Sequence, residues 1–113
     1  MISAEAAFER TLKTIKPVLI ESGFLGVDER THPHAFGSRS VTFESKEKFI
    51  RLTWDGKDEW FVLESSPASS ITFEAGWTDI LLRPFKTKSD GDKVIEDISQ
   101  EIKDSLVDYL TLK

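Results

Sequence analysis

The chain has 113 residues with 15 basic and 20 acidic side chains, which gives a formal net charge of −5. This length predicts one domain, residues 1–113, with a single modest core. The acidic balance argues against nucleic acid as a partner, because phosphates are bound by clustered lysine and arginine. The chain contains no cysteine, which excludes disulfides, thiolate nucleophiles and zinc sites built on sulfur.

Nothing in the sequence predicts a membrane segment. No run approaches about 18 consecutive apolar residues, the length that a spanning helix needs. The N-terminal region contains Glu5 and Glu9 where a secretory leader would be apolar. These features predict a cytoplasmic protein without membrane contact.

Two amphipathic helices are predicted, one in each terminal region. The first covers residues 3–22, with Ser3 as its cap and Ser22-Gly23-Phe24 as a typical stop, in which Gly23 takes the left-handed position. The second covers residues 92–112 and has a clear apolar stripe formed by Ile95, Ile98, Ile102, Leu106 and Tyr109.

Between the helices, the pattern changes to the alternation that is typical of strands. Strands are expected at 38–44, 49–54, 59–64 and 71–75, with a short edge strand around Gly26–Arg30 and a loop at 65–70. Residues 77–83 fit either a strand or a short helical turn before Pro84, and we favour the turn. The pattern predicts an α+β fold, in which an antiparallel meander of about four strands has both helices packed on one face.

The turns predict which side chains share a face of the meander. A four-residue loop at 45–48 pairs Phe43 with Ile50. Residues 55–58 have the pattern of a hairpin turn in which Gly56 is expected to supply a positive φ. Either a two-residue loop at 56–57 or a four-residue loop at 55–58 pairs Leu52 with Phe61 and Ile50 with Leu63. Together the two registers predict one apolar core face: Val41, Phe43, Ile50, Leu52, Trp54, Phe61 and Leu63.

The opposite face of the meander then carries large apolar residues among polar ones. In one interpretation, a helix, a loop or the stem of Arg51 covers these apolar residues, or each of them is exposed singly, as is common. Alternatively, they form a contact patch for another chain, since aromatic patches with a polar rim mark interaction sites. The second interpretation gives a candidate partner-binding set: Phe49, Arg51, Trp60, Val62, Glu44 and Glu64.

The sequence contains one histidine cluster, His32-Pro33-His34, which has the spacing of a partial metal site. Asp28 or Glu29 can add a carboxylate, yet no His-Glu-x-x-His pattern accompanies the pair. No serine lies in a Gly-x-Ser-x-Gly turn, and no phosphate-binding glycine loop is present. We therefore expect a protein that is not an enzyme and has no cofactor.

The layout resembles the small acidic immunity proteins that bacteria make against toxins. The likeness lies in the Ser22-Gly23-Phe24 helix stop, the meander between Phe43 and Leu63, and the closing helix between Val94 and Leu110. The resemblance implies a protein that binds a toxin domain directly and blocks its active site without a cofactor. It assigns no binding residue.

Three functional hypotheses follow. The first is a non-enzymatic protein-binding protein of the immunity type, for which the acidic charge suits a basic partner. The second is a homodimeric secretion-type chaperone that uses the same face. The third is a metal-assisted enzyme at His32 and His34.

Overall fold

The computed structural model describes residues 2–32, 36–67 and 76–111. Helix α1 (Ala4–Glu21) precedes five strands, and helix α2 (Asp92–Thr111) follows them. The strands are β1 (Leu25–His32), β2 (Ser38–Glu44), β3 (Lys48–Asp55), β4 (Trp60–Pro67) and β5 (Thr78–Pro84). They form one antiparallel sheet in the order β1-β2-β3-β4-β5.

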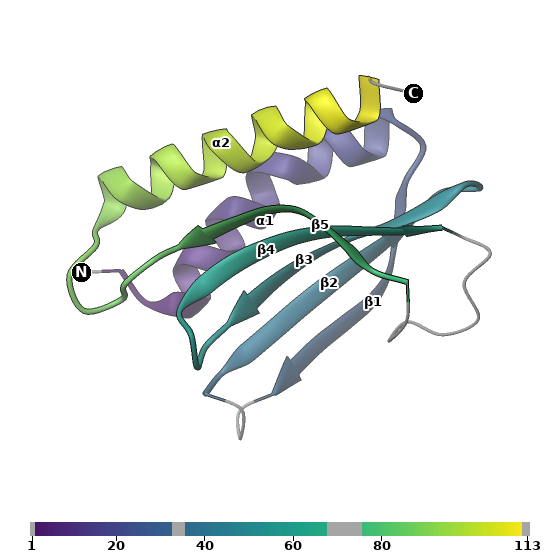
Figure 1. The fold of residues 1–113 in the computed structure, drawn as a ribbon. Coiled ribbons are helices and arrows are strands. Elements are labelled where there is room, and N and C mark those ends of the chain that lie inside the picture. Colours follow the sequence, from purple (N-terminus) through teal and green to yellow (C-terminus); the bar gives the residue numbers. More distant parts are fainter. Residues whose placement is uncertain (1, 33–35, 68–75, 112–113) are drawn as a thin grey trace.

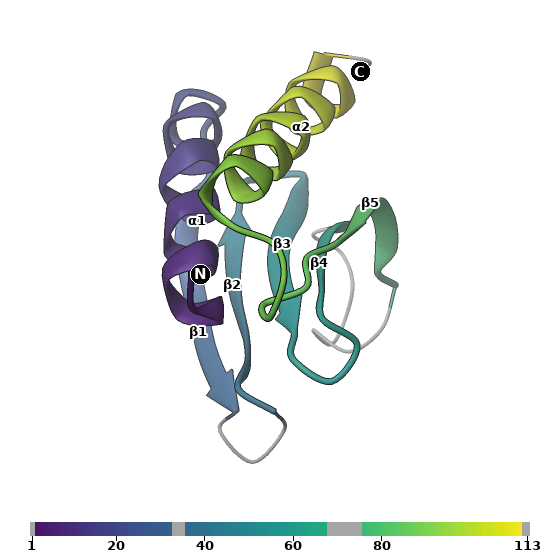
Figure 2. The same cartoon turned by 90° about the vertical axis from the view of Figure 1, so that its left-hand side faces the viewer.

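Both helices lie on the same face of this sheet, α1 beside α2, and both run in the same direction (Figures 1 and 2). The α+β class, the antiparallel meander and the helix layer are therefore confirmed. The described residues contain five strands rather than about four. No helix in this part of the chain is both long and apolar enough to cross a membrane.

Helix α1 has the two ends that the sequence predicts. At its start, the Ser3 side chain accepts a hydrogen bond from the Ala6 N–H, which would otherwise have no partner within the helix. At its end, Gly23 has a φ of 87°, and the Phe24 N–H donates to the Leu19 carbonyl at 2.9 Å. This Schellman arrangement reverses the chain and buries Phe24.

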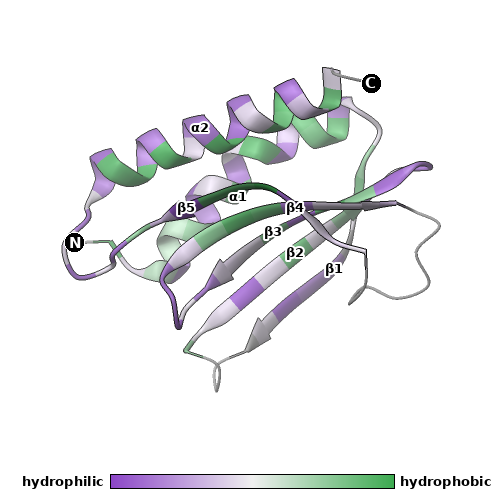
Figure 3. Ribbon diagram, in the orientation of Figure 1, coloured by the Kyte–Doolittle hydropathy of each residue, from purple (hydrophilic) through white to green (hydrophobic). Residues whose placement is uncertain are grey.

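Helix α2 packs through the predicted stripe. Ile95, Ile98, Ile102 and Leu106 are fully buried or nearly so. Figure 3 shows how hydrophobic and hydrophilic residues alternate around this helix. Besides the exposed ion pair of Arg10 with Asp92, a buried polar contact joins the two helices: the hydroxyl groups of Thr11 and Ser99 lie 3.0 Å apart. Because an unpaired buried hydroxyl is costly, this contact favours one alignment of α1 on α2.

The core face of the sheet contains all seven residues predicted for it. Each of Val41, Phe43, Ile50, Leu52, Trp54, Phe61 and Leu63 is buried. Phe85, which follows β5, joins them: its ring lies 6.3 Å from Trp54 and 6.2 Å from Phe61 between centroids. Side chains alternate between the two faces of a strand, so the intervening residues lie on the outer face, away from the helices.

The first hairpin has the predicted register, with Phe43 opposite Ile50 and Val41 opposite Leu52. The second register was predicted wrongly, by two residues: Leu52 lies opposite Leu63, and Trp54 lies opposite Phe61. The turn occupies 56–59 rather than 55–58. A shift of two residues preserves the face of every side chain, which explains why the core residues were still correct.

Asp55 explains why β3 extends one residue beyond the predicted end at residue 54. Its backbone pairs with Trp60, while its carboxylate accepts hydrogen bonds from the N–H groups of Lys57 and Asp58. Such an Asp cap stabilises a turn that begins after it. The residue with positive φ is then Glu59, at 56°, and not Gly56 as predicted.

Gly56 is needed for a different reason. A Cβ atom at this position would lie 1.9 Å from the backbone carbonyl oxygen of Phe36, which belongs to the turn between β1 and β2. The Gly56 N–H also donates to the Ser38 hydroxyl at 2.9 Å. The glycine therefore lets the tips of two hairpins meet.

Two further expectations require correction. Residues 65–67 continue β4 instead of forming a loop, and residues 78–84 form β5 rather than a helical turn. Pairing with β4 outweighs the helical spacing, because it satisfies backbone groups along the whole run. A register shift near Glu64 accommodates one extra β5 residue. The expected edge strand near Gly26 is confirmed and is longer, whereas the expected strand at 71–75 lies outside the described residues.

Gly56→Ala is expected to lower the free energy of unfolding by about 1–3 kcal/mol, because backbone atoms must move to admit the methyl group. The control is Gly26→Ala, whose Cβ would lie 3.7 Å from the Phe43 ring, an ordinary contact distance. Urea denaturation measures both variants. Equal stability of the two variants would contradict the close approach at Gly56.

Candidate functional site

The strand register arranges the outer face of the sheet in rows that cross the strands. One row contains Asp55, Trp60 and Pro84. The next contains Arg30, Ser40, Thr53, Val62 and Leu82. A third contains Asp28, Thr42, Arg51, Glu64 and Asp79, and a fourth contains Leu25, Glu44, Phe49 and Ser66.

All six residues of the predicted partner-binding set therefore share this outer face. Phe49 and Arg51 come from β3, whereas Trp60, Val62 and Glu64 come from β4, and Glu44 comes from the end of β2. Glu44 is exposed, and the other five are partly exposed. In the part of the chain that the structure describes, no helix or strand lies over this face (Figure 2).

The centre of the face is a tightly organised ion pair. Arg51 donates to Glu64 through Nε at 2.9 Å and through a terminal nitrogen at 3.1 Å, which is a bidentate contact. Thr53 donates a further hydrogen bond to Glu64. The two charged side chains are only 23% and 13% exposed, so this pair is stronger than an ordinary surface salt bridge.

Trp77 closes the Arg51 side of this arrangement. Its ring lies 4.0 Å from the central guanidinium carbon of Arg51, a cation–π contact, and 6.3 Å from the Phe49 ring between centroids. The guanidinium is thus bound by a carboxylate and covered by an indole. This arrangement restricts the positions of Phe49 and Arg51.

A second apolar region lies on β4 and β5. Val62 is directly opposite Leu82, and Trp60 is directly opposite Pro84. Leu82 is 40% exposed, while Trp60 and Val62 are partly exposed. These four residues form a continuous strip beside the Arg51–Glu64 pair, and no catalytic group is among them.

Trp77, Leu82 and Pro84 were not predicted to lie on this face, because a helical turn was favoured for residues 77–83. The pairing of β5 with β4 places Leu82 and Pro84 here, whereas contacts with Phe49 and Arg51 place Trp77. The sequence did contain a signal for this strand: residues 78–83 also fit an extended conformation, and proline, which follows them, is found at strand ends and edges. The same face includes a hollow of about 340 Å³, lined by Ser38, Arg39, Ser40, Arg51, Thr53, Asp55, Val62 and Glu64.

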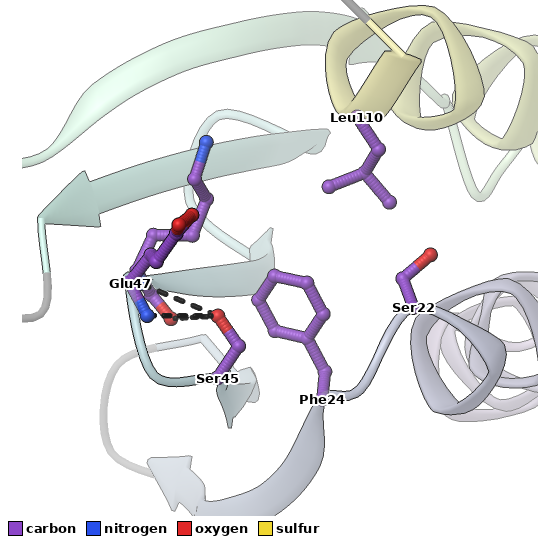
Figure 4. Close-up of a pocket in the computed structure, with 6 residues that line it drawn as sticks. Ser22, Phe24, Ser45, Glu47 and Leu110 are labelled. Atoms are coloured by element: carbon purple, nitrogen blue, oxygen red, sulfur yellow. Dashed lines mark hydrogen bonds between the residues drawn. The ribbon is translucent and has the colours of Figure 1, made fainter. Parts of the chain in front are cut away.

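Another hollow, of about 440 Å³, lies where the C-terminal ends of both helices meet the turn between β2 and β3 (Figure 4). Its lining combines Phe24 and Leu110 with polar groups of the turn. Ser45 organises that turn by accepting hydrogen bonds from the N–H groups of Glu47 and Lys48. The hydroxyl is thus engaged within the fold.

Next to this hollow, Lys48 connects the sheet to α2. Its ammonium nitrogen lies 3.3 Å from the Tyr109 hydroxyl oxygen and 4.5 Å from the centre of the Tyr109 ring. Tyr109 in turn donates to the Ser65 hydroxyl at 2.9 Å. This network holds the end of α2 on the sheet, which is a structural role.

The histidine pair is the remaining sequence candidate. His32 ends β1, and His34 lies outside the described residues. Within the ranges 2–32, 36–67 and 76–111, no three histidine, aspartate or glutamate side chains are grouped so that they could hold a metal ion.

Comparison with known proteins found no relative: no protein-family model, no curated protein sequence and no solved structure matches this chain.

Arg51→Met is expected to lower the free energy of unfolding by about 1–3 kcal/mol, because it leaves the largely buried Glu64 carboxylate without its cation. Arg30→Met is the matched control. Arg30 contacts Asp28 at 2.7 Å, but both side chains are more exposed, so its loss should cost at most about 1 kcal/mol. Urea denaturation of both variants tests the difference, and equal losses would show that the Arg51 pair is only a surface contact.

Proposed function

We propose that this chain is a non-catalytic binding protein that holds a folded protein partner on the outer face of its sheet. The observation that supports the proposal most directly is the partial exposure of Trp60, Val62 and Leu82 in one strip. Large apolar side chains that remain partly in water on a sheet face are typical of interaction surfaces. A toxin domain neutralised by direct binding, as in immunity proteins, is one partner that suits such a surface.

The composition of the face also supports protein binding. Tryptophan and arginine are the residue types that contribute most to protein interfaces, and both are present here in fixed positions. Because Arg51 is already held by Glu64 and Trp77, little side-chain entropy remains to be lost on binding. A partner therefore meets a preorganised surface.

The shape of the face favours a protein over a small molecule. Its apolar groups are spread along two strands rather than gathered in a deep cavity. Small-molecule sites are usually concave and mainly apolar. A broad sheet surface with a few anchoring side chains is suited to another protein surface.

Trp60→Ala is expected to separate binding from folding. It should cost less stability than Trp54→Ala, for which we expect about 3–5 kcal/mol because Trp54 is buried in the core. The same Trp60→Ala change should raise the dissociation constant of the complex with the partner protein by about 30-fold or more. Urea denaturation and calorimetric titration give the two values.

The partner is identified by placing the photo-crosslinker p-benzoylphenylalanine at position 60 in the native host. A discrete adduct is expected, and Leu82→Ser should abolish it. The control places the crosslinker at Glu96, an exposed position on α2, where that adduct should be absent. The proposal fails if Trp60→Ala unfolds the protein as Trp54→Ala does, or if positions 60 and 96 give the same adduct.

A further inference from the structure

The charges of the outer face indicate the chemistry of its partner. In the register of the described strands, seven charged side chains with known positions belong to this face: Asp28, Arg30, Glu44, Arg51, Asp55, Glu64 and Asp79. Two are cations and five are carboxylates. The contacts of the two cations therefore determine which carboxylates of the face can still pair with a second molecule.

Both cations are already used within the face. Arg30 contacts Asp28 at 2.7 Å, and Arg51 holds Glu64 in the bidentate pair. Each of these pairs is neutral overall. No arginine or lysine forms an ion pair with Glu44, Asp55 or Asp79 among the residues that the structure describes.

These three carboxylates surround the apolar groups. Asp55 is directly opposite Trp60, Asp79 is directly opposite Glu64 on the edge strand, and Glu44 is directly opposite Phe49. The turns at the two ends of the face, 45–47 and 56–59, do not neutralise them, because these turns contain two lysines and three carboxylates. The face therefore has apolar groups on both sides of the neutral Arg51–Glu64 pair, within a rim that has a net negative charge.

We propose that the outer face binds a basic protein surface, whose lysine or arginine side chains meet Glu44, Asp55 and Asp79 while an apolar group contacts Trp60, Val62 and Leu82. This inference rests on the proposed function. Complementary charge across an interface steers the two molecules together and sets their orientation. A second copy of this chain fits less well, because a two-fold interface would bring two negatively charged rims together, while Arg30 and Arg51 are already paired within each face.

Three synthetic peptides test the inference. They share two leucines and one phenylalanine and differ only in having lysine, glutamine or glutamate at all other positions. Binding is followed by the indole N–H signals of the protein in nuclear magnetic resonance spectra. Trp60 and Trp77 report on the outer face, and the buried Trp54 serves as an internal control.

The lysine peptide is expected to shift the signals of Trp60 and Trp77 and to leave that of Trp54 unchanged. Its affinity should fall about tenfold in the double variant Glu44→Gln/Asp79→Asn, and also when the salt concentration is raised. The matched variant Glu96→Gln/Asp108→Asn removes the same charge from exposed positions of α2 and should bind as the parent does.

Three results would overturn the inference. If all three peptides shift Trp60 and Trp77 equally, the face binds apolar groups without preference for charge, and only the proposed function survives. If no peptide shifts these two signals, both the inference and the proposed function fail. If the Trp60 signal moves with protein concentration alone, the occupant is a second copy of the chain.

Discussion

The alternation of side chains along five paired strands is the constraint on which the rest of this structure depends. Each residue of the sheet faces either the helices or the opposite side, and the hairpin registers make that assignment consistent across strands. Because α1 and α2 lie together on one side of the sheet, the apolar side chains that face this side, such as Val41, form the core. The side chains that point the other way lie on the outer face, where the described residues provide no second layer of helices or strands.

Two groups of residues on the outer face differ in how they are shielded from water. The Arg51 guanidinium is bound by the Glu64 carboxylate and covered by the Trp77 indole, which also shields part of Phe49. Around Trp60, no described residue covers the apolar strip in a comparable way, and Leu82 remains 40% exposed. The first arrangement stabilises the sheet itself. The second leaves apolar side chains partly in water, and for this reason we propose that it serves binding.

The core face was predicted well because that prediction requires only whether each residue lies at an odd or an even position along its strand. The second hairpin was displaced by two residues, yet every core residue stayed on its face. The displacement arose at Asp55, whose side chain caps the turn from within the strand. A propensity for glycine at positive φ predicted Gly56 for that role, whereas Gly56 is constrained by its contact with Phe36, which is distant in sequence.

The outer face was only partly predictable, for the same reason. Phe49, Arg51, Trp60 and Val62 lie on strands whose alternation is clear. Trp77 and Leu82 precede and follow a register shift in β5, and there the local spacing resembles a helix. Only pairing with β4 places Leu82, and only contacts with Phe49 and Arg51 place Trp77. The bidentate geometry of Arg51 with Glu64 likewise depends on the final register, which places the two residues directly opposite each other.

Photochemically induced dynamic nuclear polarisation of the uncomplexed protein measures whether the Trp60 strip faces solvent, as binding of a partner requires. With a flavin dye in solution, only indoles that the dye can touch give an enhanced signal. We expect an enhanced Trp60 indole signal and no enhancement for the buried Trp54. A Trp60 indole as silent as that of Trp54 would show that the strip is covered by the protein itself, and would contradict the account.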